Sequence, residues 1–89
     1  MRFEFDPAKS ARNKAKHGID FVEAQALWND PHRLEIAGNT IHEPRWIVTG
    51  MIEQILWSAV ITYRHDESTI RIISVRRPHP NESAGYVGG

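Results

Sequence analysis

The chain has 89 residues with 11 basic and 11 acidic side chains, a formal net charge of zero and no cysteine. This length allows one domain spanning residues 1–89, and the missing cysteines exclude disulfides and thiolate metal sites. The strongly basic balance typical of nucleic-acid-binding proteins is absent, so any such binding must come from local clusters of charge.

The first residues and the hydropathy pattern indicate where the protein works. Residues 1–6 carry charges where a secretory signal needs an apolar run. No stretch approaches the roughly 20 apolar residues that a membrane helix requires. We therefore expect a cytoplasmic protein without a membrane partner.

Residues 2–17 have the pattern of a strand followed by a helix. Charged and aromatic side chains alternate over residues 2–5, as in a half-buried strand. Asp6 then predicts a helix start as the N-cap, with Pro7 at the first helical position. This helix is expected to end near His17, because Gly18 can adopt the left-handed C-terminal conformation.

Residues 20–30 predict a second helix. Asp20 and Glu23 have the spacing of a capping box, with Asp20 in place of the usual Ser or Thr. Pro31 is expected to end the helix, because the residue before a proline avoids helical geometry. The apolar side chains fall near one helical face, at Phe21, Ala24, Leu27 and Trp28.

The remainder of the chain alternates with a period of two. This pattern predicts four short strands, over residues 34–36, 45–49, 55–63 and 69–77. Asn81 can cap a brief helix through Tyr86. Consecutive strands with short links indicate an antiparallel meander with the helices packed against one face. The predicted fold class is α+β: strand–helix–helix followed by an antiparallel meander of three to four strands.

The last predicted strand carries three arginines in an otherwise apolar sequence. Alternation places Arg71 and Arg77 on one face and Arg76 on the other. Arginine binds phosphate through a planar fork of donors and keeps its charge when partly buried. These side chains are candidates for holding an RNA backbone. The alternative is that they are edge-strand charges paired with nearby acidic residues, namely Asp66, Glu67 or Glu82.

The first predicted helix carries a basic ridge. Lys9, Arg12, Asn13 and Lys16 recur at helical spacing. Such a ridge suits a nucleic-acid backbone, because phosphate neutralisation supplies most sequence-independent affinity. A solvated helix face is the commoner explanation of the same pattern.

Acid–base candidates lie in the 42–45 segment and near the end of the third predicted meander strand. His42 or Glu43 can take a proton from a ribose 2′-hydroxyl while Arg45 stabilises the charge on the phosphorane. Tyr63 is a candidate general acid. The alternatives are an ordinary polar loop and a packing tyrosine. The five histidines lack metal-ligand spacing and no cofactor motif occurs, so we expect chemistry by side chains alone.

Ordered motifs along essentially the whole chain resemble the BrnT toxin family. Each motif alone is weak, and their ordered combination is specific. The matching segments are Phe3-Glu4-Phe5-Asp6-Pro7-Ala8-Lys9, Asn13, Lys16-His17-Gly18-Ile19, Phe21, Glu23-Ala24, Trp28, Asp30-Pro31, Glu43-x-Arg45, Gly50, Arg71-Ile72-Ile73-Ser74-Val75-Arg76-Arg77, Glu82 and Tyr86.

The resemblance implies a RelE-like fold, metal-independent cleavage of RNA and neutralisation by a BrnA-type antitoxin. It also implies that promoter DNA is bound only through the toxin–antitoxin complex. Carried over by position, Arg71 and Arg76 are the first candidates for handling phosphate, and Arg77 is the next. Further candidates at matched positions are Glu43, Arg45 and Lys9.

Two functions of different class follow from these residues. The first is a metal-independent ribonuclease that cleaves mRNA. The second is a catalytically weak or inactive toxin homologue that serves as an antitoxin-binding module in an autoregulatory DNA-binding complex. Zero net charge favours the second, as does the absence of Lys and Arg after Arg77, where the family commonly has a strongly basic helix.

Overall fold

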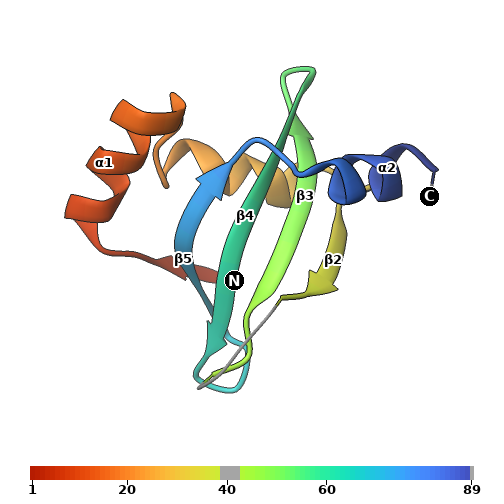
Figure 1. The fold of residues 1–89 in the computed structure, drawn as a ribbon. Helices are drawn as coiled ribbons and strands as arrows, with labels where there is room; N and C mark the ends of the chain where they lie inside the picture. Colours follow the sequence, from red (N-terminus) through yellow and green to blue (C-terminus); the bar gives the residue numbers. More distant parts are fainter. Residues whose placement is uncertain (39–42, 89) are drawn as a thin grey trace.

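A computed structural model describes residues 1–38 and 43–88 of the chain (Figure 1). Within these residues it is a mixed α+β structure whose five strands form one sheet in the order β1-β5-β4-β3-β2. In chain order the elements are β1 (Arg2–Glu4), α1 (Pro7–His17), the 3-10 helix η1 (Glu23–Asn29), β2 (Leu34–Ala37), β3 (Trp46–Ile52), β4 (Ile55–Arg64), β5 (Thr69–Arg76) and α2 (Pro80–Gly88).

From β2 to β5 each strand runs antiparallel to the next in the chain, as the sequence predicted. In the central strands Val48 pairs with Ala59, and Ala59 pairs with Val75. Strand β1 pairs in parallel with the first residues of β5. The two edges of the sheet are therefore its two shortest strands, which limits the unpaired backbone that an edge exposes.

Helix α1 has the ends that the sequence predicted. The Asp6 carboxylate accepts a hydrogen bond of 2.8 Å from the Ala8 N–H, and Pro7 occupies the first turn. At the other end Gly18 has a φ of 85°, and its N–H donates to the Lys14 carbonyl. Both ends depend on local chemistry, which is why the sequence was sufficient to find them.

The second predicted helix is a 3-10 helix, which corrects the expectation of an α-helical face. The capping box is present: the Asp20 carboxylate accepts from the Glu23 N–H, and the Glu23 carboxylate accepts from the Asp20 N–H. The buried side chains Phe21, Ala24 and Leu27 are spaced by three residues. Three residues make one turn of a 3-10 helix, so this conformation places Ala24 and Leu27 on one side, and Phe21 precedes them in the turn before η1.

Helices η1 and α2 cover opposite faces of the sheet (Figure 1). Helix η1 packs on the face that carries the hydrophobic core, which we call the core face. Gly50 permits this approach, because a Cβ there would lie 3.1 Å from Leu27 Cδ2. The prediction of helices on a single face concerned the two N-terminal helices, and the sequence predicted no face for α2. The buried core consists of Ile19, Phe21, Ala24, Leu27, Val48, Ala59, Ile61, Ile70, Ile72 and Val75.

Helix α2 begins at Pro80, and its first turn is organised by His79 and Glu82. The His79 N–H donates to the Glu82 carboxylate over 3.0 Å, and the Glu82 N–H donates back to the His79 carbonyl over 2.9 Å. The predicted cap at Asn81 is therefore wrong, because the reciprocal pair of His79 and Glu82, which lie two residues before and one residue after Asn81, defines the start instead.

Candidate nucleic-acid interface

A β-bulge in β5 brings Arg71 and Arg76 onto one face of the sheet. Arg71 pairs with Thr62 of β4, and Arg76 pairs with Ser58 of the same strand. Ser58 and Thr62 are four residues apart on β4, so their side chains lie on the same side of the sheet. Their partners Arg76 and Arg71 therefore lie on that side as well. Ile73 has no partner in this register and is the extra residue of the bulge. We call this side, opposite the core face, the arginine face.

The bulge overturns the prediction made from simple alternation. One inserted residue reverses the side on which every later side chain lies. Arg71 and Arg76 were predicted on opposite faces, and they share one. Arg77 was predicted beside Arg71, and instead its guanidinium lies over the ring of Trp57, 5.6 Å from the centroid. Its Nε donates to the Leu56 carbonyl over 3.0 Å.

Arg76 is held by Glu82 of α2. Its Nη1 and Nη2 donate to the two carboxylate oxygens over 2.8 and 3.0 Å, which is a bidentate pair. The Glu82 side chain is only 2% exposed. The Arg76 guanidinium is the main cause that lowers the pKa of Glu82 to about 2, so this carboxylate stays ionised. Arg76 thus fastens α2 to the sheet, which is one of the acidic pairings considered from the sequence.

Arg71 belongs to a cluster with excess positive charge. Its Nη1 lies 3.5 Å from Glu4 Oε1, and the Nε of Arg64 lies 2.9 Å from the same oxygen. Two guanidinium groups therefore share one carboxylate. Arg71 pairs with Glu4 and not with Asp66 or Glu67, because β1 lies beside this part of β5. The cluster is about one-third exposed and retains a net charge of +1.

A second concentration of cations lies between α1 and the edge of β5. Here a groove of about 370 Å³ is lined by Lys9, Arg12, Asn13, Lys16, His17, Phe21, Ile73 and Ser74. Three of these residues are cations and none is a carboxylate. Within residues 1–38 and 43–88, Lys9, Arg12 and Lys16 form no salt bridge. We call this region the basic groove.

Buried Asn13 fixes the wall of the basic groove. Its amide nitrogen donates to the carbonyls of Val75 and Ile19, and its amide oxygen accepts from the Val75 N–H. Strand β1 pairs with β5 only as far as Arg71. Asn13 therefore satisfies the backbone of β5 where no neighbouring strand does, and it holds α1 against that edge. From the sequence Asn13 was only one member of the basic ridge.

Tyr63 lies on the core face and is separated by the sheet from Arg71. Its hydroxyl donates to the Glu35 carboxylate, and its ring contacts Trp46 at a centroid distance of 6.4 Å. Burial, followed by the bond to Glu35, raises the pKa of the phenol well above its ordinary value. The structure does not bring Tyr63 together with the arginine face.

The segment that leads into β3 approaches the arginine face. The Pro44 carbonyl accepts a hydrogen bond of 2.9 Å from Thr62, the residue that pairs with Arg71. Glu43 and Arg45 flank this contact in the chain and are exposed. His42 lies outside the residues that the structure describes. Pro44, in the middle of the predicted acid–base segment, therefore contacts the strand residue that neighbours Arg71.

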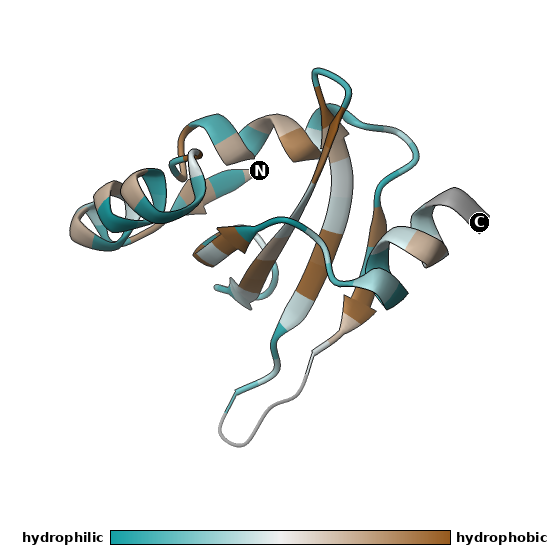
Figure 2. Ribbon diagram, turned by 45° about the horizontal axis from the view of Figure 1, so that its top comes forward, coloured by the Kyte–Doolittle hydropathy of each residue, from teal (hydrophilic) through white to brown (hydrophobic). Residues whose placement is uncertain are grey.

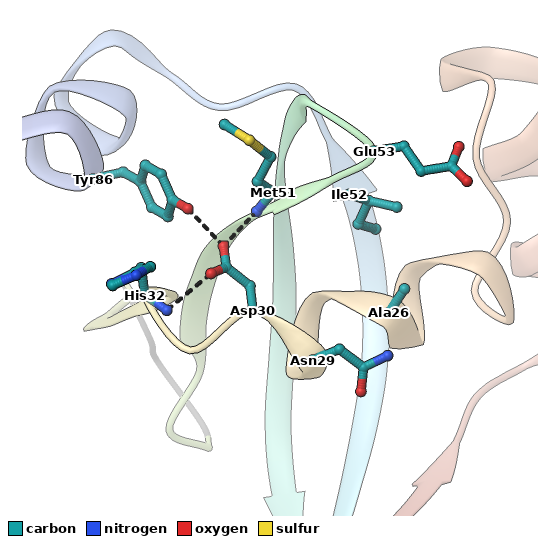
Figure 3. A pocket seen from close by; sticks show the side chains of 8 residues that line it. All are labelled: Ala26, Asn29, Asp30, His32, Met51, Ile52, Glu53 and Tyr86. Atoms are coloured by element: carbon teal, nitrogen blue, oxygen red, sulfur yellow. Dashed lines mark hydrogen bonds between the residues drawn. The ribbon is translucent and has the colours of Figure 1, made fainter.

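Asp30 organises a hollow that the sequence did not reveal (Figure 3). Its oxygens accept from the N–H groups of His32 and Met51, both over 2.8 Å, and from the Tyr86 hydroxyl over 2.7 Å. Burial opposes ionisation, yet these hydrogen bonds lower the pKa of Asp30 overall. From the sequence Asp30 only marked the end of a helix, because its partners lie up to 56 residues away.

Metal binding and membrane insertion find no support in the described residues. Among the residues that the structure describes, no three His, Asp or Glu side chains come close enough together to hold a metal ion. None of the helices in the described ranges has the length and apolar character that crossing a bilayer requires.

Comparison with known proteins identifies a family. The family model described as "Ribonuclease toxin, BrnT, of type II toxin-antitoxin system" matches residues 5–82. This range contains the basic groove and both arginines of the arginine face. A search among curated proteins found no match to the chain.

Proposed function

The chain belongs to the BrnT family, the ribonuclease toxins of type II toxin–antitoxin systems, and on this basis we propose that it cleaves mRNA in the cytoplasm without a metal ion. The observation that carries this proposal is the basic groove, whose three cations form no salt bridge with the described residues and whose lining contains no carboxylate. Clustered cations release counterions from a phosphate backbone, which supplies affinity without regard to sequence. Zero net charge does not oppose this, because the charge is concentrated locally.

The proposed reaction takes place at the arginine face, with Arg71 stabilising the charged phosphorus centre. The ribose 2′-oxygen attacks the adjacent phosphorus and its proton passes to a base, for which Glu43 and His42 are the candidates. The bond from phosphorus to the 5′-oxygen breaks, and that oxygen takes up a proton. The products are a 2′,3′-cyclic phosphate and a 5′-hydroxyl end. Arg45 is a second candidate for holding the phosphate.

The other candidates have supporting roles in this proposal. Lys9, Arg12 and Lys16 hold the RNA backbone in the basic groove. Arg76 positions α2 through Glu82, since both ends of its guanidinium fork already donate to that carboxylate. Two predicted residues retain packing roles, namely Tyr63 and Arg77.

The toxin acts with a partner, because a type II toxin has a cognate antitoxin. We propose that this antitoxin is of the BrnA type and that promoter DNA is bound only through the complex. A single toxin domain of RelE-like fold over residues 1–89 is consistent with one continuous sheet that joins β1 to the C-terminal half. The proposed chemistry involves no cofactor.

One observation favours the alternative of an antitoxin-binding module without strong catalysis. Arg76, a leading candidate for phosphate, is committed to Glu82, and no Lys or Arg follows Arg77. If RNA cleavage requires an Arg76 that is free to bind phosphate, the ion pair with Glu82 prevents cleavage by this chain. In that case the chain retains antitoxin binding and promoter control.

The purified chain incubated with RNA tests the proposal. We expect cleavage in the presence of a metal chelator and fragments that end in 2′,3′-cyclic phosphate. Arg71→Ala should abolish cleavage while retaining RNA binding. The control is Arg64→Ala. Arg64 contacts the same Glu4 oxygen as Arg71 does, and its removal should leave most of the activity. Intact RNA with the folded wild-type chain would favour the binding module.

A further inference from the structure

The β3–β4 hairpin carries a surface that RNA binding leaves unexplained. Met51 and Ile55 are 39% and 43% exposed, although both are large and apolar. Figure 2 shows hydrophobic strand segments that directly flank the hydrophilic tip of this hairpin. Apolar side chains gathered at a projecting tip mark a contact surface more often than isolated ones do.

The tip of the hairpin is also strained. Ile52 pairs with Ile55, so Glu53 and Gln54 form a two-residue turn, with φ of 49° and 72°. Such turns ordinarily contain Asn or Gly, because a larger side chain disfavours the left-handed region. Strain of this kind concentrates at functional positions. Glu53 and Gln54 thus hold the tip in a costly conformation.

Two adjoining hollows lie beneath the hairpin, with volumes of about 510 and 370 Å³. They share Ala26, Ile52 and Glu53, and we call them together the hairpin groove. Their linings contain the carboxylates of Glu23, Asp30 and Glu53 and no lysine or arginine. Figure 3 shows Asp30 and Tyr86 in the larger hollow.

The charge of the hairpin groove is only partly compensated. Lys14 neutralises Glu23 across 2.8 Å. Asp30 is held by neutral N–H and O–H donors, so its negative charge remains. In the described part of the chain, Glu53 forms no salt bridge. The groove therefore has an apolar floor with an acidic border.

We propose that the hairpin groove is the docking site of the antitoxin, and that it takes an amphipathic segment with apolar side chains against Ile52, Ile55 and Trp57 and with Lys or Arg toward Glu53 and Asp30. This proposal rests on the chain's membership of a toxin–antitoxin family. Other occupants fit less well. RNA would bring its phosphates to the carboxylates. A second copy bound about a two-fold axis would place like charges opposite one another.

The position of the groove explains how docking there would neutralise the toxin. Trp57 lines the groove and Arg77 lies over its ring. Gly18 lines the groove as well, and its neighbour His17 lines the basic groove. A segment seated in the hairpin groove therefore lies beside Arg77 and beside one end of the basic groove. It can hinder RNA binding in the basic groove without occupying that groove.

Titration of the full chain with its cognate antitoxin tests the proposal, with calorimetry as the measurement. We expect Glu53→Lys and Ile55→Ser each to weaken binding by at least about tenfold. Glu53→Gly removes the charge while relieving the left-handed backbone, so weaker binding by this variant is not due to misfolding. The matched controls are Glu67→Lys and Ile36→Ser. Glu67 also has a positive φ, in the β4–β5 turn, and Ile36 is 41% exposed on β2.

The controls should bind within twofold of the wild type, and all five variants should cleave RNA as the wild type does. Unchanged antitoxin binding by Glu53→Gly and Ile55→Ser would overturn the proposal. Loss of RNA cleavage in these variants with normal antitoxin binding would assign the groove to RNA. A dimer of the antitoxin-free chain that Ile55→Ser dissociates would assign it to a second copy. If the wild type leaves RNA intact, the proposed ribonuclease fails while the titration still decides the docking site.

Discussion

The basic groove and the smaller hollow of the hairpin groove have the same volume and opposite charge. The first contains three cations and no carboxylate in its lining, and the second contains carboxylates and no lysine or arginine. The formal net charge of zero thus hides a spatial separation of a cationic region from an acidic one. The overall charge balance of a small domain therefore says little about nucleic-acid binding when the fold separates its cations from its carboxylates.

The largest expected effect comes from removing the cations of the basic groove. The triple variant Lys9→Ala/Arg12→Ala/Lys16→Ala should bind single-stranded RNA roughly 100-fold more weakly at low salt, about 3 kcal/mol. The slope of log affinity against log salt should fall by about 2, since each lost phosphate contact contributes roughly 0.7. Fluorescence anisotropy with labelled RNA at several salt concentrations measures both.

Lys14→Ala is the matched control for this prediction. Lys14 lies on the same helix but is paired with Glu23 beside the hairpin groove. It should leave the salt slope unchanged. If Lys14→Ala and the triple variant reduce the slope equally, the division of the molecule into a basic and an acidic region has no functional meaning.

Asn13→Ala should loosen the basic groove and leave the hairpin groove intact. It removes three hydrogen bonds and leaves the buried backbone of Val75 without partners. The expected loss of unfolding free energy is about 2–3 kcal/mol. Urea unfolding checks this, with Lys9→Ala as a control on the exposed side of the same helix. If Asn13→Ala loses less unfolding free energy than Lys9→Ala does, Asn13 does not hold α1 against β5.

Glu82→Gln should destabilise the protein by about 2 kcal/mol at neutral pH, because it removes a charged bidentate partner of Arg76. The folded pKa of Glu82 is about 2, below that of an unfolded glutamate. The stabilisation is therefore complete above about pH 4.5 and is lost as the pH falls toward 2.

Thermal unfolding across pH measures this contribution. The wild type should lose stability between pH 4.5 and 2, and Glu82→Gln should lose less over that range. Parallel curves for the two proteins would assign the acid sensitivity to other carboxylates.

Tyr86→Phe should have the smallest effect, and it should be confined to the hairpin side. It removes one of three hydrogen bonds to Asp30, while the N–H groups of Met51 and His32 remain. The melting temperature should fall by less than in Glu82→Gln. Cleavage of RNA should not change. A variant that melts like the wild type but no longer cleaves RNA would connect the two regions.

Local features of the fold were predicted well because their causes are local. The caps of α1 depend on Asp6, Pro7 and Gly18, which act on backbone within a few residues. The antiparallel strands β2 to β5 follow from alternating side chains and short links. The 3-10 form of η1 was missed, because its three-residue spacing is also compatible with one side of a short α-helix.

The candidate site was predicted as a set of residues but not as an arrangement. The cations of the basic groove were found, since helical spacing places Lys9, Arg12 and Lys16 together. The prediction that Arg71 and Arg76 lie on opposite faces was wrong. The inserted residue of the bulge, Ile73, is apolar like its neighbours, so the sequence pattern does not reveal the bulge. The hollow around Asp30 could not be predicted from the sequence, because Met51 and Tyr86 are far from Asp30 in the chain.

The sequence by itself determined the chemistry available to this protein: a capped basic helix, a strand with arginines, no thiols, and motifs specific to one toxin family. Tertiary structure alone decided which of those groups are free. Arg76 is paired with Glu82, and Glu4 is shared by Arg71 and Arg64, whereas no carboxylate of residues 1–38 and 43–88 forms a salt bridge with Lys9, Arg12 or Lys16. The reason is physical, since an ion pair depends on distances of a few ångströms that register, bulge and helix packing set jointly.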